Sequence, residues 1–481
     1  MRTASSRLAI SLVALTAVLA TSGVAGARPR ATASPQTSPG SSDTDRARAA
    51  TTWSAGWAAP VQRPSAGFEE NWSEAGFDRQ TVRQVVRVTD GGSAARIKLS
   101  NRYGDQPLRI SGATIARSAG GAAVRPETLR KLTFGNRPSV TIPAGGEGAS
   151  DAAPLRVSAF DTVTVTLYFA EPTGPATFHA QAYAHSYRAS GDHRGDRTGS
   201  AFRERTRSWY YLSDVELTGA RSPHAPHSGR VAGRAQTAAS AHSASAARAG
   251  GGTGLEGHGP GDASRPGAAR RGAVVAFGDS ITDGFGSTVD ADKRYPDQLA
   301  ERLSAAGRAR PVLNAGIGGN LLLNDSAWYG DRALDRFQRD VLDKPGVSSV
   351  IVFEGLNDIG FSEVDLPTYK PNPQLSATEL IDGYRELIAR ARAKGVRVVG
   401  ATILPFKGAE YHTPRAEAKR QQINTWIRTS GEFDAYVDFA AALADPADPL
   451  ALNPAYDSGD HKHPNDAGYR AMAEAIDLDA I

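Results

Sequence analysis

The sequence predicts two folded domains: an all-β domain, then an α/β domain built on a parallel sheet. In residues 51–217, many short segments alternate apolar and polar residues, which is the period of half-buried strands. From residue 272 onward, short apolar runs alternate with helical patterns, as in parallel sheets with helices on both faces. Residues 218–271 consist mostly of Ala, Gly, Ser, His, Arg and Pro, a composition that predicts a flexible linker.

The bulk composition narrows the class of function. A chain of 481 residues is long enough for two or three domains. Its net charge of +4 is small for this length, and many arginines lie in low-complexity segments, so we predict no nucleic-acid partner. The absence of cysteine excludes disulfides, thiolate metal sites and a cysteine nucleophile.

The N-terminal residues predict a secretory signal peptide. Two arginines precede an apolar run over residues 8–19, and the small residues Ala25-Gly26-Ala27 follow it. The alternative is a membrane anchor, but the run is shorter than the ~20 apolar residues that span a bilayer. We therefore expect residues 1–27 to be a signal peptide, residues 28–50 to be a disordered leader, and the mature protein to be secreted without a stable membrane anchor.

The pattern in residues 51–217 predicts a β-sandwich or jelly-roll-like domain. Thr162–Phe169 alternates strictly between hydroxyl-bearing and apolar residues, and residues 96–99 alternate charged and apolar ones. Turn sequences such as Tyr103-Gly104-Asp105 separate the expected strands. Four tryptophans of this region could form a sugar-binding platform, although such residues more often pack in a core. They are Trp53, Trp57, Trp72 and Trp209.

Residues 272–481 contain the alternating elements of the predicted α/β domain. The expected strands are 273–277, 311–314, 349–353, 396–403 and 435–439. The expected helices are 295–305, 332–342, 377–393, 415–429 and 466–476. Ser376 and Glu379 have the spacing of a capping box, Pro414 suits a first helical turn, and Asn465 suits an N-cap.

A candidate nucleophile follows the first strand of this domain. The strand ends in Gly278-Asp279-Ser280, which places a hydroxyl at the sheet edge where α/β proteins bind ligands. A serine hydroxyl is a weak nucleophile until a base takes its proton. His463 is the best candidate base, because Asp460, three residues earlier, can hold its Nδ1 and direct its Nε2 at the serine. His461 is a competing candidate that lacks a carboxylate at this spacing.

Acyl transfer also needs hydrogen-bond donors for the developing oxyanion. The backbone N–H of Ser280 is the first candidate. The glycine-rich turn 314–320, after the second strand, can bring backbone amides close to a ligand, and Asn357 offers a side-chain amide after the third strand. Because all three segments follow the carboxyl ends of strands, one crevice can collect them. Loops that could set specificity are 321–331, 359–375 and 407–413.

Taken together, four sequence blocks in residues 272–481 resemble those of the SGNH, or GDSL, hydrolase superfamily. The blocks are Gly278-Asp279-Ser280, Gly319, Gly355-x-Asn357-Asp358 and Asp460-x-x-His463-Pro464. The resemblance implies a three-layer α/β/α, flavodoxin-like fold with no metal or other cofactor. In the N-terminal domain, residues 81–84 and 99–104 resemble the β-domain of secreted actinobacterial members less specifically.

The resemblance also implies a role for each candidate residue. Ser280 would be the nucleophile, His463 the general base and acid, and Asp460 the residue that orients His463. The oxyanion hole would consist of the N–H of Ser280, the N–H of Gly319 and the side chain of Asn357.

The sequence therefore predicts a secreted serine esterase that acts through an acyl-enzyme. Its expected substrates are small-molecule or polysaccharide esters with short acyl chains, particularly acetyl groups on carbohydrate. One alternative is a longer-chain GDSL lipase or phospholipase. Another is a carbohydrate-binding protein whose α/β domain is catalytically inactive. The sequence predicts no oligomeric state.

Overall fold

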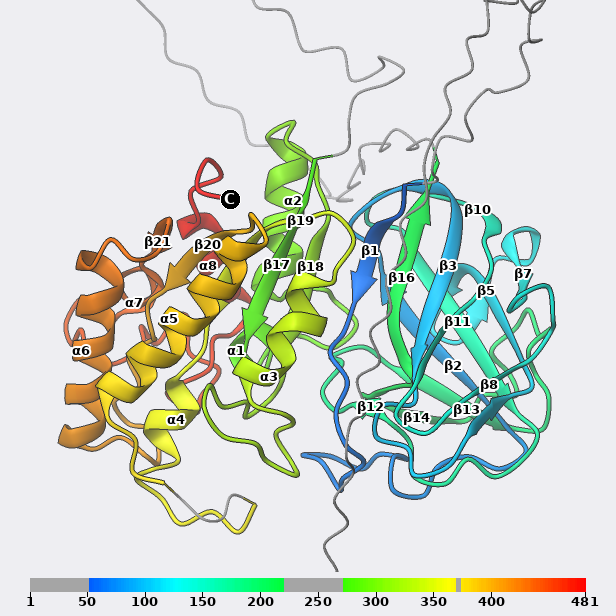
Figure 1. The fold of residues 1–481 in the computed structure, drawn as a ribbon, viewed down its shortest axis with the longest axis horizontal. Coiled ribbons are helices and arrows are strands. Elements are labelled where there is room, and N and C mark those ends of the chain that lie inside the picture. The colour runs from blue at the N-terminus through cyan, green and yellow to red at the C-terminus, as the bar shows by residue number, and fades with distance from the viewer. Residues whose placement is uncertain (1–51, 220–270, 369–372) are drawn as a thin grey trace, which may run out of the picture. The chain divides into compact units, whose positions relative to one another are not determined.

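A computed structural model describes residues 52–219, 271–368 and 373–481 of the protein. These described residues form one compact unit that contains an antiparallel β part and a part with a parallel sheet (Figure 1). The predicted signal peptide, leader and nearly all of the predicted linker lie outside the described residues. Within the described ranges, no helix has both the length and the apolar character needed to cross a bilayer.

The β part consists of two main antiparallel sheets and two short strand pairs. The first sheet has the order β1 (Ser54–Ala58), β16 (Leu212–Thr218), β3 (Gly92–Ser100), β10 (Ala153–Val157), with β9 (Glu147–Ala149) also paired to β3. The second has the order β14 (Glu204–Thr206), β13 (Ser186–Ser190), β2 (Gln80–Arg87), β11 (Thr162–Phe169), β5 (Gly112–Gly120), β6 (Ala123–Val124), with β7 (Arg130–Leu132) also paired to β5. The short pairs are β4 (Leu108–Ile110) with β8 (Val140–Ile142), and β12 (Phe178–His179) with β15 (Trp209–Tyr210). A short 3-10 helix covers Pro126–Thr128.

The tryptophans of the β part belong mainly to its core. Trp57, Trp72 and Trp209 are buried within one apolar cluster, so these three rings form no exposed platform. Trp53 is half-buried, and the Arg96 guanidinium lies 4.1 Å from the centre of its ring. The alternative of packing in the core therefore holds for three of the four residues.

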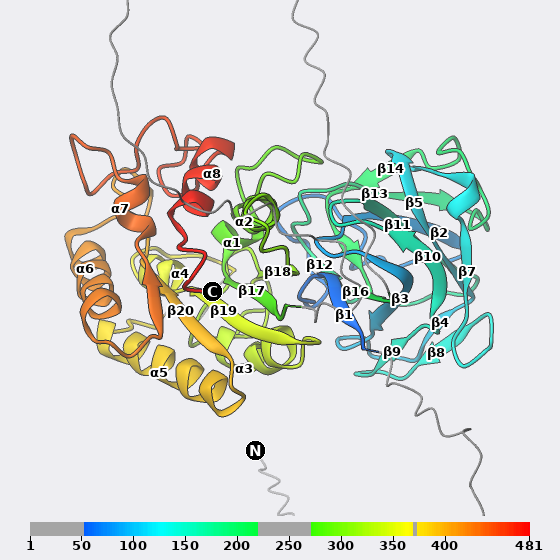
Figure 2. The same ribbon diagram turned by 90° about the horizontal axis from the view of Figure 1, so that it is seen from above.

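The C-terminal part has a five-stranded parallel sheet in the order β18 (Val312–Gly316), β17 (Ala273–Gly278), β19 (Val347–Phe353), β20 (Arg397–Ala401), β21 (Ala435–Val437). Its α-helices are α1 (Ser280–Asp283), α2 (Tyr295–Ala305), α3 (Ala333–Phe337), α4 (Leu356–Gly360), α5 (Ala377–Ala393), α6 (Pro414–Thr429), α7 (Phe439–Leu443) and α8 (Asp466–Ala475). Figure 2 shows α5 and α6 as neighbours, in agreement with their contacts. The predicted alternation of strands and helices is therefore present in this part of the chain.

Local capping signals fixed several helix ends as predicted. The Ser376 hydroxyl accepts from the Glu379 N–H while the Glu379 carboxylate accepts from the Ser376 N–H, which completes the capping box of α5. Asn465 caps α8 through the N–H groups of Ala467 and Gly468.

Several predicted elements have other bounds in the structure, and two of these differences have a local cause. The expected strand 435–439 stops at Val437, because the Asp438 side chain accepts the Ala441 N–H and starts α7 instead. The expected helix 332–342 is α3 followed by a π-helical turn over Gln338–Leu342.

The strands nearest the candidate site end at the same level. Gly278 at the end of β17 pairs in register with Gly316 of β18 and with Phe353 of β19. The segments after these three strands therefore emerge together at one edge of the sheet.

A buried arginine on α3 joins these strand ends. The Arg336 guanidinium donates to the carbonyl oxygens of Gly278 and Ala315, both at 2.8 Å. It also donates to Asn320 Oδ1 at 2.7 Å and to Glu354 Oε1 at 3.0 Å. Its side chain is fully buried, so these contacts replace the water that its charge would otherwise need.

We predict that Arg336→Leu lowers the free energy of unfolding by about 3–5 kcal/mol, because it leaves the buried Glu354 carboxyl and two carbonyl groups without their donor. Urea denaturation followed by circular dichroism measures the loss. Arg385→Leu is the control, since Arg385 pairs with Glu432 at the surface and should be far less sensitive. If the urea midpoint of Arg336→Leu equalled that of wild type, Arg336 would not stabilise the strand ends as we expect.

Candidate active site

Ser280, His463 and Asp460 form a continuous hydrogen-bonded chain. Ser280 Oγ lies 2.7 Å from His463 Nε2, although the two residues are 183 positions apart. His463 Nδ1 lies 2.5 Å from Asp460 Oδ2, and the backbone N–H of His463 donates to Asp460 Oδ1 at 2.9 Å. The structure thus brings together a hydroxyl, an imidazole and a carboxylate in the order that activates a serine.

Local structure fixes the serine and the imidazole. Asp279 accepts the Ile281 N–H at 3.0 Å and thereby caps α1, so that Ser280 stands in the first turn directly after β17. His463 lies in the loop immediately before α8, and the ring of Phe285 packs 4.2 Å from the imidazole. Both side chains are buried, which limits their alternative rotamers.

The electrostatics favour a neutral imidazole. Burial lowers the pKa of His463, and the hydrogen bond that its Nδ1–H donates to Asp460 opposes this shift. Burial tends to raise the pKa of Asp460, but the hydrogen bonds that it accepts from His463 outweigh this effect and hold the pKa far below its usual range. A charged carboxylate beside Nδ1 keeps the imidazole proton there, so Nε2 is free to accept the Ser280 proton.

His461, the competing candidate base, pairs with Asp457 and not with Ser280. Its Nδ1 lies 2.8 Å from Asp457 Oδ2, and more than half of its side chain is exposed. The spacing argument overlooked Asp457, which lies four residues before His461 rather than three. Of the two candidate histidines, His463 is the one whose ring contacts Ser280 Oγ.

The two remaining candidate donors line the same cavity as Ser280 and His463. Gly319 has φ of +74°, and a Cβ at this position would overlap the ring of Tyr329, so only glycine fits. Asn357 Nδ2 donates to the Asn320 carbonyl at 3.0 Å. Its second contact, with Asp279 Oδ2, is long at 3.4 Å, and this is the one that a substrate oxygen could replace.

The neighbouring residues Asn357 and Asp358 on α4 have different contacts. Asn357 lines the cavity, whereas the Asp358 carboxylate accepts the backbone N–H groups of Leu322 and Leu323. Burial raises the pKa of Asp358 to about 6, and these hydrogen bonds oppose the shift. Asp358 therefore holds the loop that follows Gly319 and Asn320.

The cavity around Ser280 has a volume of about 210 Å³. All three loops singled out from the sequence contribute to its walls, with Tyr329, Phe361, Leu366, Glu410 and Tyr411. Lys462, between the two histidines, also lines the cavity and pairs with Glu410 at 2.6 Å.

Sequence reasoning missed the contribution of the β part. Phe68 and Gln181 line the cavity together with Ser280. His179 of β12 places Nε2 3.0 Å from Asp283 Oδ1 at the end of α1, and Asp283 Oδ2 accepts the Gly318 N–H at 3.0 Å. No local pattern in the sequence marks these residues, because only the packing of the two parts brings them to the site.

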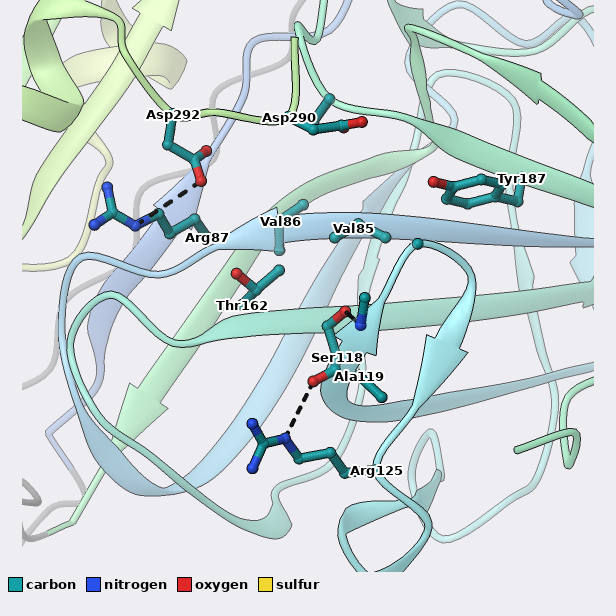
Figure 3. Close-up of a pocket in the computed structure, with 13 residues that line it drawn as sticks. Val85, Val86, Arg87, Ser118, Ala119, Arg125, Thr162, Tyr187, Asp290 and Asp292 are labelled. Atoms are coloured by element: carbon teal, nitrogen blue, oxygen red, sulfur yellow. Dashed lines mark hydrogen bonds and ion pairs between the residues drawn. The ribbon is translucent and has the colours of Figure 1, made fainter. Parts of the chain in front are cut away.

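A larger cavity of about 390 Å³ lies elsewhere, along β2 and β5 (Figure 3). Its Arg87 is paired with Asp292 at 3.9 Å and with Glu301 at 2.7 Å. Its lining contains no histidine that could activate a hydroxyl, so the smaller cavity around Ser280 is the better candidate active site.

Residues 276–471 match the model of the GDSL-like Lipase/Acylhydrolase family. No curated protein matches the chain. Among solved structures, the chain is similar to a GDSL-like lipase from Bacteroides thetaiotaomicron, with 20% identity and a TM-score of 0.33 over 43% of this chain and 87% of that one. It is similar to a catalytic mutant of an acetylxylan esterase from Geobacillus stearothermophilus, with 24% identity and a TM-score of 0.34 over 43% and 93% of the two chains. A further acetyl xylan esterase has 22% identity and a TM-score of 0.34 over 42% and 96%.

We predict that His463 titrates below the usual histidine pKa of about 6.5, because burial disfavours its charged form. In Asp460→Asn the midpoint should fall further, since the carboxylate that favours the imidazolium is gone. NMR titration of the ring protons measures both values. Asp457→Asn is the control, because Asp457 contacts His461 and should leave the His463 midpoint in place. A higher midpoint in Asp460→Asn would contradict the assignment.

Proposed function

We propose, from the premise that residues 276–471 carry a domain of the GDSL-like lipase/acylhydrolase family, that this protein is a secreted serine esterase. It hydrolyses carboxylic esters through an acyl-enzyme. One observation carries the proposal: the Ser280–His463–Asp460 chain, with contacts of 2.7 Å and 2.5 Å, opens on a cavity. Secretion is supported by the N-terminal sequence alone.

In the first half of the reaction, Ser280 Oγ attacks the ester carbonyl carbon while His463 Nε2 takes the hydroxyl proton. Asp460 stabilises the imidazolium that forms. When the tetrahedral intermediate collapses, the bond to the alcohol oxygen breaks, and His463 gives its proton to that oxygen. The alcohol leaves, and the acyl group remains on Ser280.

In the second half, His463 takes a proton from water, and the water oxygen attacks the acyl carbon. When this second tetrahedral intermediate collapses, the bond to Ser280 Oγ breaks, His463 returns its proton to that oxygen, and the acid leaves. In both tetrahedral intermediates the negative oxygen is held by the N–H groups of Ser280 and Gly319 and by Asn357 Nδ2. Asn357 exchanges its long contact with Asp279 for the shorter bond to the oxyanion.

The size of the cavity favours short acyl groups, acetyl in particular. At about 210 Å³ it is smaller than the roughly 300–1,000 Å³ of sites for drug-sized ligands. A longer-chain lipase or phospholipase is the second candidate, favoured by the apolar walls at Phe361 and Leu366. A comparison of kcat/KM across esters of increasing acyl length separates the two.

We predict that Ser280→Ala lowers kcat/KM on an aryl acetate by several orders of magnitude, because the nucleophile is lost. A chromogenic assay with purified protein measures the rate. Ser348→Ala is the control, since Ser348 is in β19 but does not line the cavity. Wild-type activity in Ser280→Ala would remove Ser280 from the mechanism, and an inactive wild-type protein would favour the carbohydrate-binding alternative.

We predict that Asn357→Ala lowers kcat by roughly 10²–10³-fold if its amide is one oxyanion donor of three. Asn424→Ala is the matched control, because Asn424 is also buried but its side chain bonds to the Ile403 backbone and does not line the cavity. Folded Asn424→Ala should therefore keep its kcat. An unchanged kcat in Asn357→Ala would refute the donor role.

A further inference from the structure

One buried polar group in the cavity wall has no partner. Gln181, from the β part, is only 7% exposed and lines the cavity beside Ser280. Its Oε1 is buried and accepts no hydrogen bond from any described residue. A buried acceptor without a donor is costly, and in a cavity wall it favours a ligand that brings the donor.

Gln181 lies at the oxyanion end of the cavity. A Cβ at Gly318 would overlap Gln181 Oε1, so the amide packs directly against the turn whose next residue is Gly319. A substrate held by the Gly319 N–H therefore has atoms close to this carboxamide.

An exposed aromatic ring lies beside this amide. Phe68 is 44% exposed, lines the same cavity and stacks on Tyr329 with ring centres 5.6 Å apart. In the described residues, only Phe68 and Tyr436 are large hydrophobic side chains with such exposure. An open aromatic face beside a hydroxyl acceptor suits a sugar ring, which presents C–H groups on its face and hydroxyls at its edge.

We propose that Gln181 recognises the alcohol part of the substrate by bonding to a free hydroxyl near the ester. The β part thereby selects esters of polyhydroxylated alcohols such as sugars. A hydroxyl donates to Oε1 and can also accept from Nε2, so it pairs with either end of the amide. An ester whose alcohol part carries no free hydroxyl leaves Oε1 unpaired when it fills the cavity. This inference rests on the proposed esterase function.

The test compares two acetyl esters of similar ring size: a monoacetylated monosaccharide and cyclohexyl acetate. In wild type we expect kcat/KM to favour the sugar ester. In Gln181→Met, which keeps the length of the side chain but removes the amide, the ratio of the two kcat/KM values should fall roughly 10- to 100-fold. In Gln181→Glu, which keeps an acceptor of the same shape, the ratio should stay near wild type even if the charge lowers both rates.

Gln62→Met is the matched control. Gln62 is also a buried glutamine of the β part, but it bonds to the backbone of Ala180 and Trp328 and does not line the cavity. Its substrate ratio should equal that of wild type, and thermal unfolding checks that each variant is folded. An unchanged ratio in folded Gln181→Met overturns the inference, as does an equal ratio in Gln62→Met and Gln181→Met.

The two proposals fail in different ways. If the inference about Gln181 is wrong, both esters are still cleaved in a Ser280-dependent manner, and only the ratio fails to respond. If the esterase proposal is wrong, wild type cleaves neither ester, or Ser280→Ala remains active.

Discussion

The candidate site depends on one buried charge, the Arg336 guanidinium. It joins the carbonyl groups at the ends of β17 and β18 to the first residue after β19, and it also holds Asn320 in the turn beyond Gly319. Every candidate donor and the nucleophile follow one of these three strand ends within a few residues. Because parallel strands are in register here, a single cation can fix the relative positions of segments that the chain supplies far apart.

The same cation helps to explain how the acidic side chains of Asp279 and Glu354 can both be buried near the cavity. Burial raises the pKa of Asp279 to about 7 and that of Glu354 well above its usual value, and Arg336 opposes both shifts. Protonation of one member of this group relieves the repulsion among them. Asn357 brings an uncharged donor into these acidic surroundings, where a cationic side chain would instead pair with Asp279 and be lost to the substrate.

Local chemistry decided what could be predicted from the sequence. The capping box made α5 begin at Ala377, and Asp460 at three residues from His463 identified a pair that the structure holds at 2.5 Å. The sequence left open what packing decides: periodicity favoured core positions for the tryptophans but could not separate the half-buried Trp53 from the three buried ones, and spacing did not reveal that Asp457 holds His461. The catalytic roles, the three-layer arrangement and the domain boundaries remain predictions.

The β part contributes to the site in two ways: it supports the turn that carries Gly319, and it lines the cavity. The sequence blocks in the C-terminal part indicate neither contribution. His179 bonds to Asp283, and Asp283 in turn accepts the Gly318 N–H, so the turn that presents Gly319 is held from the β part as well as from α1. Both ring nitrogens of His179 face oxygen atoms, those of Pro60 and Asp283, which fixes the ring in one orientation. A turn held this way fixes the Gly319 N–H, which is what its proposed role as an oxyanion donor requires, because preorganised donors are the ones that stabilise a developing charge. The β part is therefore a structural component of the candidate active site, in addition to lining it with Phe68 and Gln181.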